Sequence, residues 1–455
     1  MFTRSAGVAI VCAVLGYGCS LDTSALPPEV VGDASTADSR VRGGDVGPED
    51  GGAGDARTDS SVTPTDSAVV PPDGGCDTST PCPLGCSVID PGRCSHLVSS
   101  NVDIDYGAVA DVMIDSNVDI DTTSCSGGSL PLAMDSGICV LRARTVTIAS
   151  AVIVRVHGAA PFAVLAADGI QVDGVVDAAA RGREPGPGGR SRAMGTDAED
   201  GTGGRHTSSG VADSGGSGAG LCGSGGKGGD AGGNGSQTGA AGAMALGGSF
   251  DGRPLRGGGH GGGGRDRTGP GAAGGGGGGA VQLSAGREIV IGATGGVIAG
   301  GGGGVGASQS SSDDAVGSGA GGGSGGVILL EAPTVTVAGR LWAPGGGGSA
   351  TAIPWTDGDG GDDGSLGSAP QPSGGTASSS AAGGGGSGGM GGGAVTIDGE
   401  AGGDIFGYPF NGGGGGGGSG CTITRTLAGV APSGGTHSPA ISSSAFRSLA
   451  LLGTD

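Results

Sequence analysis

Short apolar stretches recur along the chain, and each is followed by glycine. Three copies begin near residues 163, 280 and 327. When they are aligned, apolar residues fall into three columns: Ile170, Ile289 and Val335; Val172, Ile291 and Val337; and, at looser spacing, Val176, Val297 and Leu341. A unit this short cannot bury its apolar face alone, so the pattern predicts copies that stack on one another.

The spacing of these stretches indicates the fold class. From residue 145 onward, short runs of branched residues are separated by a few turn residues, without helical periodicity. We expect an all-β fold, a right-handed parallel β-helix or β-solenoid-like stack with long glycine-rich insertions. An antiparallel β-sandwich is the alternative.

Glycine blocks occupy about 186–280, 300–326, 345–393 and 412–420, and 116 of the 455 residues are glycine. Such a composition is typical of low-complexity sequence. Because glycine has no Cβ, its extended segments can approach one another to backbone hydrogen-bonding distance, as in bundled polyglycine II helices. Flexible loops are the other interpretation. Collagen is excluded because no strict Gly-X-Y period runs through the blocks.

The N-terminus has the layout of a bacterial export signal. Arg4 precedes an apolar run over 6–15, and small residues lead to Cys19. The end of this segment, 1–19, resembles the lipobox of bacterial lipoproteins, which implies lipidation of Cys19. It departs from that pattern because Gly16 stands where leucine is expected. Ordinary cleavage near Gly18, with release of a free product, is the alternative.

Charge limits the partners. The formal net charge is −21, which disfavours binding to the nucleic-acid phosphate backbone. Much of the acidity lies in 20–74, where large apolar residues are scarce. This segment cannot bury enough surface to offset the entropy of ordering, and we expect a disordered tether. Membrane attachment is expected through the lipid anchor.

Eight cysteines follow the signal, and an even number in an exported chain favours disulfides. Four lie in a small module over 75–98: Cys76, Cys82, Cys86 and Cys94. Two bridges are expected there, and the spacing matches no strong zinc motif. Cys125 and Cys139 flank a turn and are expected to pair. Cys222 and Cys421 remain, and their pairing would tie the glycine-rich middle to the C-terminal end.

The rest of the chain divides by composition. We expect β-strands over 99–182, a glycine-rich insertion over 183–280, strands with a glycine insertion over 281–345, a glycine/serine-rich acidic loop over 346–393, and C-terminal strands and tail over 394–455. A repeat, SNVDID, starts at Ser100 and again at Ser116. Direct stacking of its copies would place Asp103 near Asp119, with calcium or solvent relieving the repulsion.

Candidate chemistry is sparse. Carboxylates at Asp357, Asp359, Asp362 and Asp363, separated by glycine, could wrap calcium, or form a solvated acidic loop. The motif G-x-S-x-G at Ser324 and Ser387 is expected by chance in so glycine-rich a chain.

Two further groups bear on carbohydrate. A carbohydrate site could use Asp173, Asp177, Arg181 and Arg183, positions equally expected where a strand leaves a core. Trp342 and Trp355 could stack on a sugar, although packing is the ordinary role of a tryptophan after Leu341.

Together, the export cysteine, acidic tether, CPLGC knot, the phrase DGIQVDGVVDAAARG and the glycine blocks resemble glycine-rich surface lipoproteins of myxobacteria. By composition alone they also resemble the PGRS domains of mycobacterial PE proteins. The first resemblance implies an outer-membrane or cell-surface lipoprotein of a Gram-negative bacterium with no established activity. We therefore expect a non-enzymatic protein without a cofactor and with a structural, adhesive or extracellular-matrix role, whose partners are cell-surface glycans or matrix. A carbohydrate-binding or carbohydrate-cleaving β-helix is the alternative.

Overall fold

The computed structural model describes 97–103, 109–191, 199–205, 213–232, 237–246, 249–265, 271–308, 317–353, 356–365, 370–377, 386–404 and 411–452. Contacts divide the chain into Met1–Val69 and Val70–Asp455, and all described residues belong to the second unit. The described residues form an all-β structure without a helix. Eighteen strands among these residues are arranged in three mostly parallel sheets.

The largest sheet has seven strands in the order β18-β16-β13-β10-β7-β4-β3. They are β3 (Leu132–Asp135), β4 (Ile138–Ala143), β7 (Phe162–Ala166), β10 (Ala280–Ala285), β13 (Val327–Glu331), β16 (Cys421–Thr426) and β18 (Phe446–Ala450). The central strands β7, β10, β13 and β16 are buried along their whole length. Burial on both faces explains the near-continuous apolar runs of β7 (FAVLA) and β13 (VILLE), whereas β10 and β16 also bury polar residues such as Gln282 and Thr424.

The other sheets have six and five strands, in the orders β17-β15-β12-β9-β6-β2 and β1-β5-β8-β11-β14. The six are β2 (Val118–Asp121), β6 (Ile153–His157), β9 (Val175–Asp177), β12 (Gly296–Ile298), β15 (Arg340–Trp342) and β17 (Thr436–Ser438). The five are β1 (Val112–Ile114), β5 (Val146–Ile148), β8 (Gly169–Val172), β11 (Glu288–Ile291) and β14 (Thr334–Val337). In the five-stranded sheet, β8, β11 and β14 alternate buried and more exposed positions, as one solvated face requires.

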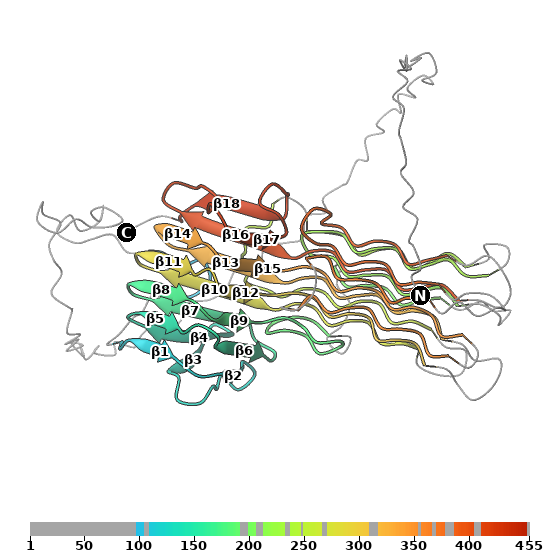
Figure 1. Ribbon diagram of the computed structural model, residues 1–455, viewed down its shortest axis with the longest axis horizontal. Helices are drawn as coiled ribbons and strands as arrows, with labels where there is room; N and C mark the ends of the chain where they lie inside the picture. Colours follow the sequence, from blue (N-terminus) through green and yellow to red (C-terminus); the bar gives the residue numbers. More distant parts are fainter. Residues whose placement is uncertain are drawn as a thin grey trace, which may run out of the picture. The chain divides into compact units, whose positions relative to one another are not determined.

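From β7 to β15, consecutive strands are distributed one to each sheet. The triplets β7-β8-β9, β10-β11-β12 and β13-β14-β15 each contribute a strand to the seven-, five- and six-stranded sheets in turn, and pair in parallel with the next triplet (Figure 1). All three columns predicted by the alignment are confirmed: Ile289 pairs with Ile170 and Val335, Ile291 with Val172 and Val337, and Val297 with Val176 and Leu341.

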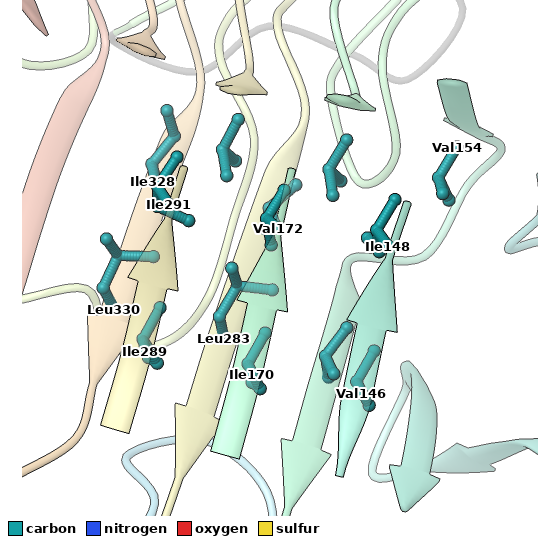
Figure 2. Packing of buried hydrophobic residues seen from close by; sticks show 14 of the residues in the cluster. Val146, Ile148, Val154, Ile170, Val172, Leu283, Ile289, Ile291, Ile328 and Leu330 are labelled. Carbon is teal, nitrogen blue, oxygen red and sulfur yellow. The ribbon is translucent and has the colours of Figure 1, made fainter. Parts of the chain in front are cut away.

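The main core lies where the three sheets present their apolar faces to one another. Figure 2 shows side chains such as Ile170 and Ile289 repeating from strand to strand on the same side of their sheet. Most of its members are Val, Ile, Leu and Ala, and Phe446 on β18 joins it near the C-terminal end of the stack. The ring of His437 meets Phe446 edge-on at 5.4 Å, and burial lowers the pKa of His437 below its ordinary value.

A second core covers the other face of the seven-stranded sheet. Val102, Leu221 and Leu255 pack there against apolar residues of β4, β7, β10, β13 and β16. Among them lies a buried polar network in which Glu331 accepts hydrogen bonds from Gln282 and Ser284, each at 2.8 Å. Ser100 also donates to Glu331. The residues just after the cysteine-rich segment are thereby held against this sheet.

The glycine blocks leave and re-enter the sheets at matching positions. When 345–393 and 412–420, which lie in the same connection, are counted as one block, each block leaves after a strand of the six-stranded sheet and returns before a strand of the seven-stranded sheet. The two ends of each block are joined by a hydrogen bond, in which the amide of the last glycine before the next strand donates to the carbonyl of the alanine just after the preceding strand. These bonds run from Gly279 to Ala178, from Gly326 to Ala299 and from Gly420 to Ala343. Because the strands are stacked, all three blocks start from one edge, and Figure 1 shows their extended segments running side by side.

The described glycine segments are joined to one another by backbone hydrogen bonds. Along 412–420 every third amide donates to the same neighbour, in turn 213–219, 397–403 and 343–349. Its carbonyls accept from three more segments, 223–229, 319–325 and 389–392. The segment thus has six neighbours, and 319–325 and 343–350 are surrounded in the same way. Period-three bonding between chains is what an extended helix with three residues per turn presents.

At many interior positions the space between these segments is too small for a Cβ, although small side chains such as those of Ala320 and Ser324 are buried at others. A Cβ on Gly417 would overlap the carbonyl of Gly323, and one on Gly414 would overlap the carbonyl of Ala320. At the periphery, larger residues recur at every third position and are exposed, as at Asp398, Ala401 and Asp404. Glycine is therefore required by packing at such interior positions.

Two disulfides lie among the described residues. Cys125 is bonded to Cys139, and Cys222 to Cys421, with Cα atoms 5.3 and 5.4 Å apart. Both predicted pairings are confirmed. The second joins the glycine block to the first residue of β16, across 199 positions of sequence.

Two expectations are wrong. The antiparallel sandwich fails because, among the described strand pairs, only β3 with β4 is antiparallel. The SNVDID copies do not stack on each other. The second forms β2 and pairs with β6, whereas in the first Asn101 donates to Gly252 and Gln282 on the far side of the seven-stranded sheet. Register is set by the buried columns of the triplets, and 97–103 lies outside them.

Candidate binding cavity

A column of alternating charge lies on the outer face of the six-stranded sheet. In register, Asp119 on β2 pairs with Arg155 on β6, and Arg155 pairs with Asp177 on β9. Ile120, Val154 and Val176 on the same strands belong to the main core. Since successive side chains point to opposite faces, the charged residues point outward. Opposite charges directly across neighbouring strands attract.

Arg155 is held at the base of the site. Its Nη1 lies 3.1 Å from Oδ1 of Asp177 and donates to the carbonyl of Ala179 at 2.8 Å. Burial lowers the pKa of Arg155 from its ordinary value, and the Asp177 carboxylate opposes that shift. The guanidinium remains charged because its ordinary pKa is so high.

A tight turn brings a second guanidinium to the same carboxylate. Arg181 and Glu184 exchange backbone hydrogen bonds, and Gly182 between them has a positive φ of 52°. Nη2 of Arg181 lies 3.2 Å from Oδ2 of Asp177. Asp177 is 8% exposed and also accepts from the amide of Ala179 at 3.1 Å. Asp177 therefore orients both arginines.

His157 closes another side of the site. Its Nε2 lies 3.1 Å from Oδ1 of Asp119. Gly158 follows with a positive φ of 115°, where a Cβ would meet Thr122, Thr123 and Asp121. The turn at Gly158 consequently passes close to the end of β2 and leaves the imidazole on the outer face.

These groups surround a cavity of about 610 Å³. Its charged or ionisable lining residues are Asp119, Arg155, His157, Arg181 and Glu184. Gly158, Ala159, Pro185, Gly189 and Ser191 complete the wall. The volume lies within the range of small-molecule sites. The cavity thus offers both hydrogen-bond donors and carboxylate acceptors.

The carbohydrate site predicted from the sequence overlaps this cavity only in part. Arg181 lines it and Asp177 lies behind it, whereas Arg183 and Asp173 are not among its lining residues. Asp173 instead accepts from Gln171 at 2.8 Å beside the five-stranded sheet. The sequence pattern did not single out four other residues as part of this site: Asp119, Arg155, His157 and Glu184. Alternation in the stretches VDID and IVRVH places the first three on an outward face, but their pairing depends on register.

The predicted calcium ligands Asp357, Asp359, Asp362 and Asp363 are not brought together. Oδ1 of Asp363 accepts the amides of Gly182 and Gly303 at 2.8 and 2.7 Å. Across the part of the chain that the structure describes, no group of three or more His, Cys, Asp or Glu side chains could hold a metal ion. Asp363 serves as a backbone acceptor within the glycine bundle.

Two other candidate residues, Trp342 and Ser324, are buried and pack or hydrogen-bond within the fold. Trp342 is 6% exposed and packs with Val175, Ala179 and Ile298, so it is not free to stack on a sugar. The hydroxyl of Ser324 is buried and accepts the amide of Gly259 at 2.9 Å, an arrangement that does not expose a nucleophile. Trp355, the lipidation candidate Cys19, and Cys76, Cys82, Cys86 and Cys94 lie outside the described residues.

Comparison with known proteins gives no relative: the chain matches no protein-family model, no curated protein and no solved structure. In the described ranges, no helix has the length and apolar character needed to cross a membrane.

Proposed function

We propose that this chain is a non-enzymatic cell-surface lipoprotein with a structural, adhesive or extracellular-matrix role. The observation that carries the proposal is the hydrogen-bonded packing of the glycine segments. In 412–420 the amides and carbonyls are directed to six neighbouring segments rather than to a cleft. Such material is suited to forming a stiff body, because its segments are held to neighbours on all sides by backbone hydrogen bonds.

For the architecture, we propose a right-handed parallel β-helix or solenoid that carries a polyglycine II bundle. Support comes from the strand triplets, whose members enter the three sheets in a constant order. Support for the bundle comes from the period-three hydrogen bonds. In this architecture the strands supply the apolar core. The glycine bundle continues from one edge of the strand stack and is held together by backbone hydrogen bonds.

The proposed location rests on the N-terminal sequence and on the resemblance to glycine-rich surface lipoproteins. A lipid on Cys19 would anchor the chain, and the acidic segment 20–74 would separate the folded body from the membrane. The net charge of −21 makes anionic head groups and nucleic acid poor partners. Glycans or matrix at the cell surface are the proposed partners.

The anchoring part is tested with Cys19→Ala, with Cys12→Ala as the matched control in the same export signal. We expect Cys19→Ala to shift the protein from the membrane fraction to the soluble fraction, because the acyl chains are lost. Cys12→Ala should fractionate as the wild type. Equal membrane retention of Cys19→Ala and wild type would contradict lipid anchoring.

Carbohydrate binding is the second candidate function, and one observation favours it. The cavity lined by Asp119, Arg155, Arg181 and Glu184 gathers donors and acceptors on one face of the strand stack. Stacking of a sugar on Trp342 is not supported, because this side chain is buried.

A further inference from the structure

We propose that the charged cavity beside β2, β6 and β9 binds a neutral, hydroxyl-rich saccharide. This deepens the second candidate function, carbohydrate binding, and rests on it; the scaffold role stands without it. The proposal rests on three properties of the cavity: two oriented guanidinium groups, carboxylates on the same walls, and a space bounded by small residues.

The donors are positioned before any ligand arrives. Arg155 and Arg181 both contact Asp177, through Oδ1 at 3.1 Å and Oδ2 at 3.2 Å respectively. A guanidinium has five N–H donors in a fixed plane, so each arginine keeps donors for the cavity after contacting Asp177. Holding both in place in advance lowers the entropy lost when a ligand binds.

The acceptors lie among these donors. Asp119 and Glu184 line the same cavity, and Asp119 contacts Nε2 of His157 at 3.1 Å. A hydroxyl both donates and accepts, so neighbouring hydroxyls on a sugar ring can bond a carboxylate and a guanidinium together. Ligands with only acceptors or only donors would leave part of the lining unsatisfied.

Charge favours a neutral ligand. Guanidinium and carboxylate groups are equal in number on the cavity lining, and the further carboxylate of Asp177, behind the wall, contacts both arginines. The chain as a whole carries −21. An acidic sugar would therefore meet repulsion from Asp119, Glu184 and the surrounding field. A neutral sugar meets none.

The shape suits a sugar unit. Gly158, Ala159, Pro185 and Gly189 form walls without long side chains, and the space is about 610 Å³. Among the described lining residues, His157 supplies the only aromatic ring that could stack on a sugar. Binding is thus polar, and we expect a dissociation constant on the order of 1 mM for one sugar unit.

The test measures sugar binding to the purified full-length chain. Methyl glycosides of glucose, galactose and mannose are titrated, with galacturonate as the acidic comparison, by ligand-observed NMR. The variants are Arg181→Gln and Glu184→Gln, both on an exposed turn. Arg183→Gln is the matched control, because Arg183 lies on that turn without lining the cavity.

We expect at least one neutral glycoside to bind, and its affinity to fall about tenfold or more in Arg181→Gln and in Glu184→Gln, since each loses a charged hydrogen bond. Arg183→Gln should bind as the wild type. The proposal is overturned if no neutral glycoside binds at 50 mM (about fifty times the expected constant), if galacturonate binds and the neutral sugars do not, or if all three variants bind like the wild type. None of these outcomes alters membrane anchoring through Cys19, so the two proposals fail separately.

Discussion

At the scale of single residues, glycine is selected by the nearness of other backbones. Gly417 lies in the middle of 412–420, and a Cβ there would overlap the carbonyl of Gly323. Gly203 is also in the bundle, but a Cβ on it would meet only the carbonyl oxygen of Gly263, at 3.5 Å. Both positions are glycine, but only Gly203 has space for a side chain.

We therefore expect Gly417→Ala to lower the free energy of unfolding by about 1–3 kcal/mol or more, because overpacking forces neighbouring segments apart. Gly203→Ala should change it by less than about 0.5 kcal/mol, as for an ordinary surface substitution. Denaturant unfolding of both variants measures the difference. Equal stability of the two variants would show that the interior segments are not packed against one another.

At the scale of elements, side-chain oxygens take the place of backbone carbonyls as acceptors for some amides of the glycine-rich segments. Asp363 accepts the amides of Gly182 and Gly303, and Ser217 accepts that of Thr202 at 2.9 Å. Asp398 and Asp404 accept the amides of Ser224 and Asp230. These three aspartates thus serve as acceptors for backbone amides of the glycine-rich segments.

Asp363→Ala should lower the free energy of unfolding by about 1–3 kcal/mol, because two amides lose their acceptor. The exposed Asp359→Ala is the control and should be near neutral. Thermal unfolding is measured with calcium and with a chelator, and the wild type should be unaffected by the exchange. If calcium stabilised the wild type and neither variant, the result would contradict this account and support a calcium site at these carboxylates.

The strands could be predicted from the sequence, and the glycine segments only in part. Columns such as Ile170, Ile289 and Val335 carry their register in the apolar pattern itself. The glycine blocks contain a weaker signal, the spacing of Ser224, Lys227 and Asp230 by two glycines each, which marks one outward side of a three-residue turn. Which segment adjoins which is set by backbone contacts that have no side-chain signature.

The cavity was less predictable for a related reason. Asp177 and Arg181 are near each other in sequence, and their contact follows from one turn. Arg155 and Asp119 join them only through pairing of β2, β6 and β9. Sequence reasoning found the local half of the site and missed the half that depends on strand register.

At the scale of the whole folded unit, the stacked strands and the glycine bundle depend on each other. Stacking places the departing residues Ala178, Ala299 and Ala343 along one edge, so the blocks start in register. The disulfide between Cys222 and Cys421 adds a covalent link between bundle and sheet. The central claim is that the glycine blocks are an ordered part of the fold.

Hydrogen exchange followed by mass spectrometry tests that claim most directly. Amides of interior segments 319–325 and 412–420 should exchange as slowly as those of β10 and β13, because both sets are buried and hydrogen-bonded. The same peptides from a chemically denatured sample serve as the fast-exchanging reference. Exchange of the interior glycine amides at the rate of that reference, with β10 and β13 protected, would contradict the ordered bundle.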